Sequence, residues 1–104
     1  MPSPSRGEVW LVDLGMVAKV RPRLVLSVPA GVQDRALATL VIHTTSIRGT
    51  SYEVAVQSRF LRPGAFDTQD IVTVPHAKFL RKLGDLPPDQ LALVEQSVRR
   101  WLAL

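Results

Sequence analysis

The sequence predicts a mainly β fold in which short strands form a small barrel or a curled antiparallel sheet, with one helix at the end of the chain. Two patterns carry this prediction. Over the first two thirds of the chain, short runs rich in Val, Leu, Ile and Thr are separated by Gly and Pro, as in strands joined by turns. From residue 87 onward, apolar residues recur at helical spacing instead. A chain of 104 residues suits one core, so we expect a single domain over residues 1–104, with a disordered lead at residues 1–5.

Five strands are expected, each a run of β-branched, aromatic or aliphatic residues that ends at a turn signal. They are Glu8–Leu14, Pro22–Val28, Leu37–Thr45, Tyr52–Gln57 and Asp70–Val74. Side chains alternate between the two faces of a strand, so Leu24, Leu26 and Val28 share one face of the second strand. Arg21 and Arg23 lie on its other face.

The terminal helix is expected to begin at Pro88, because proline suits the first position of a helix. Asp89 in the first turn, and Arg99 and Arg100 near the end, match the helix dipole. One apolar stripe is expected to pack on the sheet, and it consists of Leu91, Val94, Val98, Trp101 and Leu102.

The chain is basic, with 13 Lys and Arg against 9 Asp and Glu, and arginine predominates among the cations. Arginine suits planar recognition of phosphate better than lysine does. The charge is spread evenly along the chain, so a site for a polyanion must be built by folding rather than by a basic tail. No apolar run is long enough to span a bilayer, and the first residues lack the order of a signal peptide. We therefore expect a cytoplasmic protein without a membrane partner.

The residue inventory restricts the chemistry. The absence of cysteine excludes disulfides and thiolate-bound metals, and the two histidines lack the spacing of a metal site. The six glycines are isolated at turns, and no nucleophile elbow is present. We therefore expect no metal and no cofactor.

Cleavage of RNA remains open to such a chain, because the ribose 2′-OH is a nucleophile that the substrate itself supplies. The protein then has to orient this hydroxyl, stabilise charge on the phosphate and assist proton transfer. Suitable side chains gather near the ends of two strands, and they are Arg21, Arg23, His43, Thr44, Thr45 and Ser46. Each also has an ordinary role in a solvated strand edge, a turn or a half-buried position. Residue types alone leave a catalytic site, an RNA-binding surface and a structural role open.

The order of segments resembles the MazF/PemK (Kid) toxins of bacterial toxin–antitoxin modules. Arg6–Leu14 (RGEVWLVDL) is similar to the family's opening RGEIWxVxL, and Lys19–Ser27 (KVRPRLVLS) is similar to its K-x-RP-x-L-V-v-S. The later blocks follow in the family's order, and they are Val41–Ser46, Tyr52–Val54 and Asp70–Gly84. The resemblance thus covers nearly the whole chain.

This resemblance implies an SH3-like barrel of the CcdB/PemK type with a C-terminal helix, usually as a homodimer. It also implies an endoribonuclease, or mRNA interferase, that cleaves single-stranded RNA sequence-selectively without a metal. The 2′-OH attacks the adjacent phosphate, which leaves a 2′,3′-cyclic phosphate and a 5′-OH end. A cognate antitoxin protein blocks the site.

By position, the family's catalytic arginine falls on Arg21 and its catalytic threonine on Thr45, with Ser46 beside it. Arg21 is then expected to hold the scissile phosphate through a charge-assisted fork, and Thr45 to donate a hydrogen bond to the same group. His43 stands where the family usually has proline, on the same strand face as Thr45, so it is a candidate to assist as base or acid. The other candidate RNA contacts are Lys19, Arg23, Arg48 and Gln69.

Two other functions stay open at this point. CcdB-like relatives poison DNA gyrase through protein contacts and cleave nothing, and Trp101 near the C-terminus keeps that option. A non-catalytic SH3-like binding module is the third possibility. Only the endoribonuclease requires the Arg21 and Thr45 pair.

Overall fold

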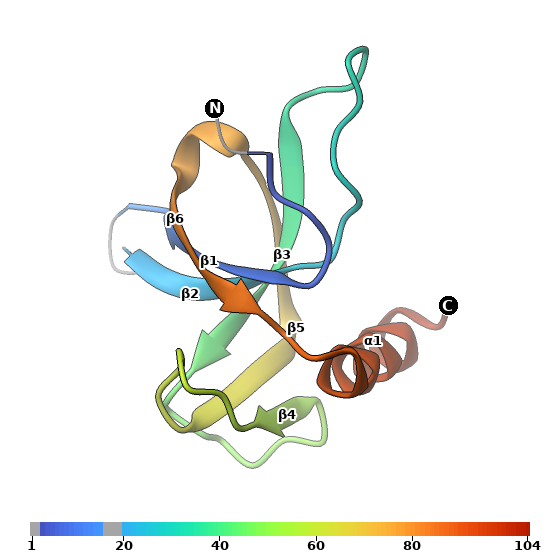
Figure 1. Ribbon diagram of the computed structural model, residues 1–104. Coiled ribbons are helices and arrows are strands. Elements are labelled where there is room, and N and C mark those ends of the chain that lie inside the picture. Colours follow the sequence, from blue (N-terminus) through green and yellow to red (C-terminus); the bar gives the residue numbers. More distant parts are fainter. Residues whose placement is uncertain (1–2, 16–19) are drawn as a thin grey trace.

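A computed structural model describes residues 3–15 and 20–104, and within them the chain forms six strands, a short 3₁₀ helix and one α-helix (Figure 1). The elements are β1 (Glu8–Asp13), β2 (Val20–Val25), β3 (Leu37–Thr44), β4 (Glu53–Val56), β5 (Gly64–Pro75), η1 (His76–Lys78), β6 (Phe79–Asp85) and α1 (Pro88–Leu102). The strands form one antiparallel sheet in the order β4-β5-β3-β2-β1-β6. The predicted mainly β fold with a C-terminal helix is confirmed.

The strand prediction was wrong for β5 and β6, and β2 spans Val20–Val25 rather than Pro22–Val28. β5 begins at Gly64 rather than Asp70, since Gly64 and Ala65 pair with Val56 and Ala55 of β4. The Pro-Gly signal before it indicated only a break, whereas it opens the second strand of a hairpin. β6 was not predicted as a strand at all. It pairs with β1 at the edge of the sheet and carries exposed Arg81 and Lys82, as charged edge strands do.

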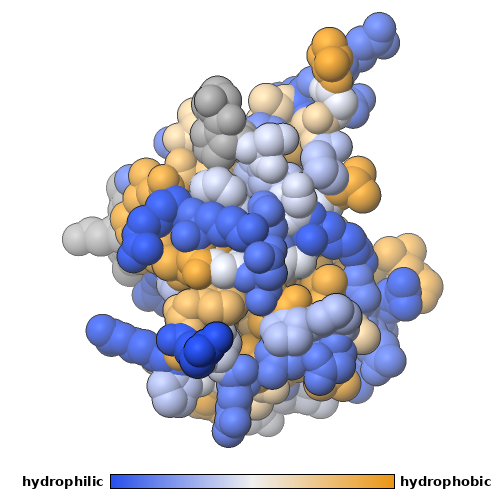
Figure 2. Space-filling view, in the orientation of Figure 1, coloured by the Kyte–Doolittle hydropathy of each residue, from blue (hydrophilic) through white to orange (hydrophobic). Residues whose placement is uncertain are grey.

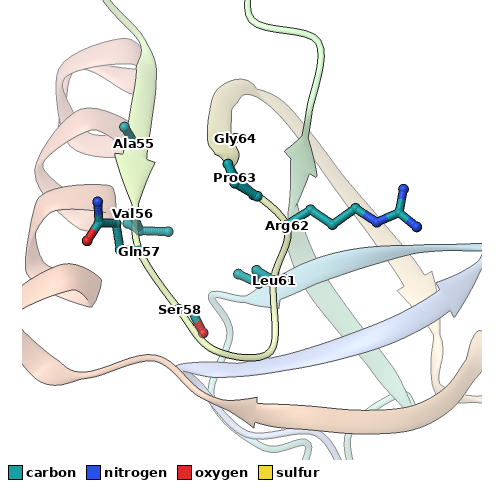
Figure 3. A pocket seen from close by; sticks show the side chains of 8 residues that line it. All are labelled: Ala55, Val56, Gln57, Ser58, Leu61, Arg62, Pro63 and Gly64. Atoms are coloured by element: carbon teal, nitrogen blue, oxygen red, sulfur yellow. The ribbon is translucent and has the colours of Figure 1, made fainter.

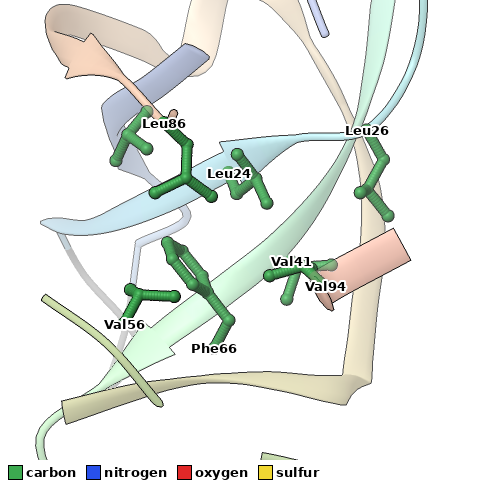
Figure 4. Close-up of a cluster of buried hydrophobic side chains, with 8 residues drawn as sticks. Leu24, Leu26, Val41, Val56, Phe66, Leu86 and Val94 are labelled. Carbon is green, nitrogen blue, oxygen red and sulfur yellow. The ribbon is translucent and has the colours of Figure 1, made fainter. Parts of the chain in front are cut away.

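Two clusters of buried side chains form the core, one on each side of the central strands. The first consists of Val9, Leu24, Leu26, Val41, Val56, Phe66, Leu86 and Val94, and the second of Val12, Val25, Ala38, Leu40, Val74 and Phe79. Figure 4 shows the Phe66 ring within the first cluster, pointing toward Leu24 and Leu86. The predicted alternation of Leu24 and Leu26 is confirmed. Val28 lies beyond the end of β2 and is exposed, so its predicted place on that face was wrong.

α1 packs beside β4 and β5, and it begins at Pro88 as predicted (Figure 1). Val94 joins the first core cluster, and the Ser97 hydroxyl lies 2.6 Å from the Thr68 hydroxyl of β5. The predicted stripe was too long, because Trp101 and Leu102 are exposed. The Trp101 ring instead meets Tyr52 edge-on, with their centroids 5.2 Å apart.

The N-terminal segment is packed where the structure describes it. Pro4 is fully buried, and the Ser5 amide donates to Glu8 Oε1 at 2.8 Å. The expected disordered lead is therefore wrong for residues 3–5, and residues 1–2 lie outside the described residues. Among the described residues, no helix combines the length and apolar character needed to cross a membrane. Figure 2 shows hydrophilic side chains in a band across one face, with hydrophobic patches beside it.

Candidate active site

A pocket of about 550 Å³ opens where β2 and β3 diverge. Four of the predicted site residues line it together: Arg21, His43, Thr45 and Ser46. The rest of its wall comes from β1, β2, the segment after β4 and β6, and consists of Leu11, Val20, Pro22, Phe60, Leu61, Arg62, Arg81 and Leu83. Residues far apart in the sequence thus meet in one cavity.

Pro22 explains why the pocket forms at this point. β2 pairs with β3 only over Arg23–Val25, whereas its pairing with β1 continues through Pro22 to Val20. A proline cannot donate to a ladder, so it fits where β2 has already left β3. The gap that opens exposes Arg21 and gives it access to the end of β3.

Arg21 stands between two cavities. On its other side lies a smaller pocket of about 250 Å³, which shares Arg21 and Ser46 with the first and is also lined by Ile42, Thr44, Arg48, Glu53, Asp67 and Asp70. Arg48, a predicted RNA contact, therefore borders the second cavity and not the first. Among the described residues, Arg21 lies within ion-pair distance of no carboxylate. Its guanidinium is thus available to a ligand from either side.

A turn at the end of β3 presents Thr45 and Ser46. The Thr44 hydroxyl accepts a hydrogen bond from the Ser46 amide at 3.0 Å, which is a local turn of the kind Ser and Thr favour. Thr45 and Ser46 are exposed, and within the described part of the chain neither hydroxyl makes a hydrogen bond. Both hydroxyls are free to donate to a phosphate.

Glu53 anchors the loop that follows this turn, a role that the sequence did not reveal. Its carboxylate oxygens accept hydrogen bonds from the backbone amides of Arg48, Gly49 and Thr50, with N–O distances of 2.9, 2.6 and 2.8 Å. The hydrogen bond from the Arg48 amide, together with those from Thr50 and Gly49, lowers the pKa of Glu53. The Tyr-Glu-Val block of the family pattern therefore holds the segment that continues from Thr45 and Ser46.

His43 forms part of the inner wall of the larger pocket. Only 4% of its surface is exposed, and its ring meets Phe66 edge-on at 5.2 Å. Its Nε2 atom is buried without a hydrogen-bond partner among the described residues. Burial lowers the pKa of His43, so the imidazole is neutral at neutral pH and able to accept a proton.

Arg23 is buried, in contrast to Arg21, with 2% of its surface exposed. Its Nη1 atom donates to the Arg21 carbonyl at 3.3 Å. Burial lowers the pKa of the Arg23 guanidinium, and the charge of Asp70 opposes this. This geometry favours a positioning role for Arg23, and its contact with RNA stays a prediction.

Gln69, another predicted contact, lies away from both cavities. Gln69 is exposed on an unpaired stretch of β5, since β3 residues Val41 and Ile42 pair with Ile71 and Asp67 across a bulge. Lys19 lies outside the described residues.

Arg62 and Arg81 are pocket residues that sequence reasoning missed. Arg62 lies in the segment between β4 and β5, and Arg81 lies on β6, which was not predicted as a strand. Among the described residues neither one forms an ion pair. Three exposed arginines, Arg21, Arg62 and Arg81, thus line the larger pocket together with Thr45 and Ser46, and we call it the arginine-lined pocket. Such a set suits a ligand with more than one phosphate.

A further pocket, of about 530 Å³, lies on the other side of the segment between β4 and β5 (Figure 3). Leu61 and Arg62 belong to both this pocket and the arginine-lined one. In Figure 3 Leu61 points toward Val56, whereas Arg62 extends to the opposite side. Over residues 3–15 and 20–104, no group of three or more His, Cys, Asp and Glu side chains gathers as metal ligands would.

Solved structures of known proteins share this fold. An endoribonuclease from a mycobacterial species, solved with its cognate antitoxin, is 25% identical, with a TM-score of 0.85 over 98% of this chain and 97% of that one. A second mycobacterial endoribonuclease is 25% identical, with a TM-score of 0.82 over 100% and 95% of the two chains. The MazF chain of a MazE–MazF complex from Deinococcus radiodurans is 22% identical, with a TM-score of 0.83 over 100% and 99%.

A search of curated proteins found no match to this sequence. The model of one family, the PemK-like, MazF-like toxins of type II toxin-antitoxin systems, matches residues 5–102. That span includes β1, the divergence of β2 and β3, the turn at Thr45, and all of α1. The resemblance stated from the sequence is thereby confirmed, and the chain belongs to the PemK-like, MazF-like toxins of type II toxin-antitoxin systems.

Proposed function

We propose that this chain is a toxin endoribonuclease that cleaves single-stranded RNA, mRNA included, sequence-selectively and without a metal. The observation that carries the proposal is the pocket in which Arg21, Thr45, Ser46 and His43 meet. Family membership supports it, as does the activity named for the two mycobacterial relatives.

The reaction uses the substrate's own nucleophile. The 2′-OH adjacent to the scissile phosphate attacks phosphorus, the bond from phosphorus to O5′ breaks, and the products carry a 2′,3′-cyclic phosphate and a 5′-OH. Arg21 holds the non-bridging oxygens and stabilises the charge that develops on them. The hydroxyls of Thr45 and Ser46 donate to the same phosphate. Arg62 and Arg81 bind the phosphates on either side of it.

His43 takes the proton of the 2′-OH in this proposal. Its burial keeps the imidazole neutral, and a neutral imidazole can act as a base but has no imidazolium proton to give. The proton that O5′ gains then comes from solvent or from a group other than His43. An H43Q variant that keeps full cleavage from about pH 5 to about pH 8 would overturn this role.

We also propose two protein partners. A cognate antitoxin covers the arginine-lined pocket and so inhibits the toxin, by analogy with the relatives solved with an antitoxin. A second copy of the chain forms a homodimer, which the family usually does. Exposed apolar side chains that such partners can cover are Leu80, Leu93, Trp101 and Leu102.

Cleavage of RNA in the presence of EDTA tests the proposal. R21A should lose about 100- to 1,000-fold in rate, because it removes one preorganised donor to the reacting phosphate. R35A is the matched control: it removes one other exposed arginine, which borders neither cavity, so it should cleave like the wild type. Equal activity of R21A and the wild type would refute the proposed site. If the wild type cleaves no RNA but binds gyrase, the result would favour a gyrase-poisoning toxin. If it binds RNA without cleaving it, the result would favour a non-catalytic binding module.

A further inference from the structure

Phe60 lies at the border of the arginine-lined pocket, in the segment between β4 and β5. It is half-buried, and its amide donates to the Ser58 hydroxyl at 3.3 Å. Its ring packs directly against the backbone of Gly84 on β6. A Cβ at Gly84 would lie 2.5 Å from Phe60 Cε1 and 2.6 Å from Cδ1, so a side chain at that position would displace the ring. The absence of a side chain at Gly84 thus leaves the room that the Phe60 ring occupies.

Phe60 packs partly against the first core cluster, but its ring lacks the aromatic and cationic partners that other aromatic rings of the protein have. Trp10 meets Phe79 edge-on, His43 meets Phe66, and Tyr52 meets Trp101 and Arg100. Within the described part of the chain, Phe60 makes no ring–ring or cation–π contact of this kind. The part of Phe60 that borders the cavity is therefore available to an aromatic group of a ligand.

The wall around Phe60 combines apolar and cationic side chains. Leu11, Leu61 and Leu83 line the same cavity, as do Arg21, Arg62 and Arg81. A nucleotide needs both surfaces, because its base is flat and largely apolar on its faces while its phosphates are anionic. The cavity therefore offers a place for a base beside the place for the phosphates.

We propose that Phe60 is the stacking platform for one base of the bound RNA and that Gly84 is the positioning residue that sets the height of this ring. The inference rests on the proposed endoribonuclease function, since it assigns a subsite of that same pocket. Stacking on an aromatic ring tolerates any base, because every base has a π-face. Phe60 thus contributes affinity and orients the nucleotide next to the scissile phosphate, while other groups read the edge of the base.

The test measures the affinity for a short single-stranded RNA that contains the cleavage sequence mapped with the wild type. A 2′-O-methyl group at the scissile nucleotide prevents cleavage. F60L keeps an apolar side chain but removes the ring, and it should weaken binding about 5- to 150-fold. F60Y keeps the ring and should bind within about twofold of the wild type. Y52L is the matched control, since it removes an aromatic ring that packs on α1 away from this cavity, and its affinity should not change.

RNAs with one abasic nucleotide, moved along the sequence, identify the base that stacks. At that position the losses from F60L and from the missing base should not add, because both remove the same contact. G84A should weaken binding as F60L does, and it should add no further loss in the F60L background. Should F60L fail to fold, the abasic series with F60Y and G84A gives the same comparison.

Wild-type affinity of F60L, or an additive loss at every abasic position, overturns the inference. Cleavage by the wild type that depends on Arg21 would then still stand, so the proposed function survives that result. A wild type that neither binds nor cleaves RNA overturns both proposals together.

Discussion

Arg21 and Arg23 share a face of β2, yet only Arg21 reaches the pocket. Alternation along the strand predicted the shared face, and the structure adds that Arg23 pairs with β3 and is buried, whereas Arg21 lies beyond that pairing and is exposed. The buried arginine is thus the one within the β2–β3 ladder, and no local pattern in the sequence marks the end of that ladder except Pro22. Residue types therefore predicted both arginines as candidates and could not separate a ligand-binding side chain from a supporting one.

His43 shows the same limit for a single residue. Its position on the face of Thr45 follows from the sequence, and both side chains border one pocket. Its near-complete burial depends on Phe66 and on Gly64, whose absent Cβ would lie 3.0 Å from His43 Cε1. These neighbours come from β5, so the lowered pKa of His43 is a tertiary effect that strand alternation does not predict.

The lowered pKa of His43 predicts a pH dependence of stability. Below about pH 6.5 the imidazole of His43 is protonated in the unfolded chain, whereas in the folded chain it becomes protonated only at a lower pH. The unfolded state then binds more protons, so the free energy of unfolding falls as the pH drops through this window and recovers above it. H43Q removes this contribution.

Urea unfolding of the wild type and of H43Q between about pH 5 and about pH 8 measures the effect. The wild type should lose stability relative to H43Q as the pH falls, and the two should run parallel above about pH 7. Identical slopes at low pH would mean that His43 titrates normally in the folded chain.

At the scale of elements, regular alternation and turn signals were sufficient to find the first four strands, although β2 ends at Val25 and not at Val28. Helical spacing was sufficient to find α1, although its last apolar residues are exposed. β6 was missed because Phe79–Asp85 carries three charged residues and pairs only with β1. The first half of β5 was missed because the Pro63-Gly64 pair is typical of a turn that ends a strand, whereas here β5 begins at Gly64. Arg62 and Arg81 come from these poorly predicted regions, which is why the sequence identified only part of the pocket.

The loop after β3 depends on a single carboxylate on β4. E53A removes the acceptor of the amide protons of Arg48, Gly49 and Thr50. Amide hydrogen exchange at these positions should become faster, while the core strands keep their protection. Cleavage should fall by up to about 100-fold, because a displacement of Thr45 and Ser46 misplaces their hydroxyls.

Nuclear magnetic resonance measures the rate of amide hydrogen exchange at each residue, in the wild type and in E53A. E53Q is the matched variant, since its amide oxygen can still accept and should restore most of the protection. Unchanged exchange at Arg48 to Thr50 in E53A would show that the loop is held by other contacts.

At the scale of the molecule, the net charge of +4 predicts attraction to a polyanion but not the place of contact. The even distribution of charge along the chain predicted a site built by folding. In the structure the three pocket arginines come from β2, from the segment after β4 and from β6. The composition could predict the kind of ligand, whereas the assembly of its site required the sheet order.

RNA affinity should therefore depend on salt. If the site neutralises about 3–5 phosphates, a plot of log K against log salt has a slope of about −2 to −3.5 for single strands. R62A and R81A should each make this slope shallower by about 0.7, with little change in which sequence is preferred. The slope is measured from the binding of a non-cleavable RNA at several salt concentrations. R35A is the control, and its slope should equal that of the wild type. A slope near zero would contradict a phosphate-binding pocket.

The nature of the RNA ends tests the central claim most directly. Wild-type protein is incubated with RNA in EDTA, the cleavage site is mapped, and the same RNA is then offered with a 2′-deoxy nucleotide at that site. We predict a 2′,3′-cyclic phosphate and a 5′-OH on the cleaved RNA, and no cleavage of the deoxy substrate, because the attacking hydroxyl is gone. A 5′-phosphate end, or continued cleavage at the deoxy site, would contradict an account in which the protein only holds the phosphate and moves the proton.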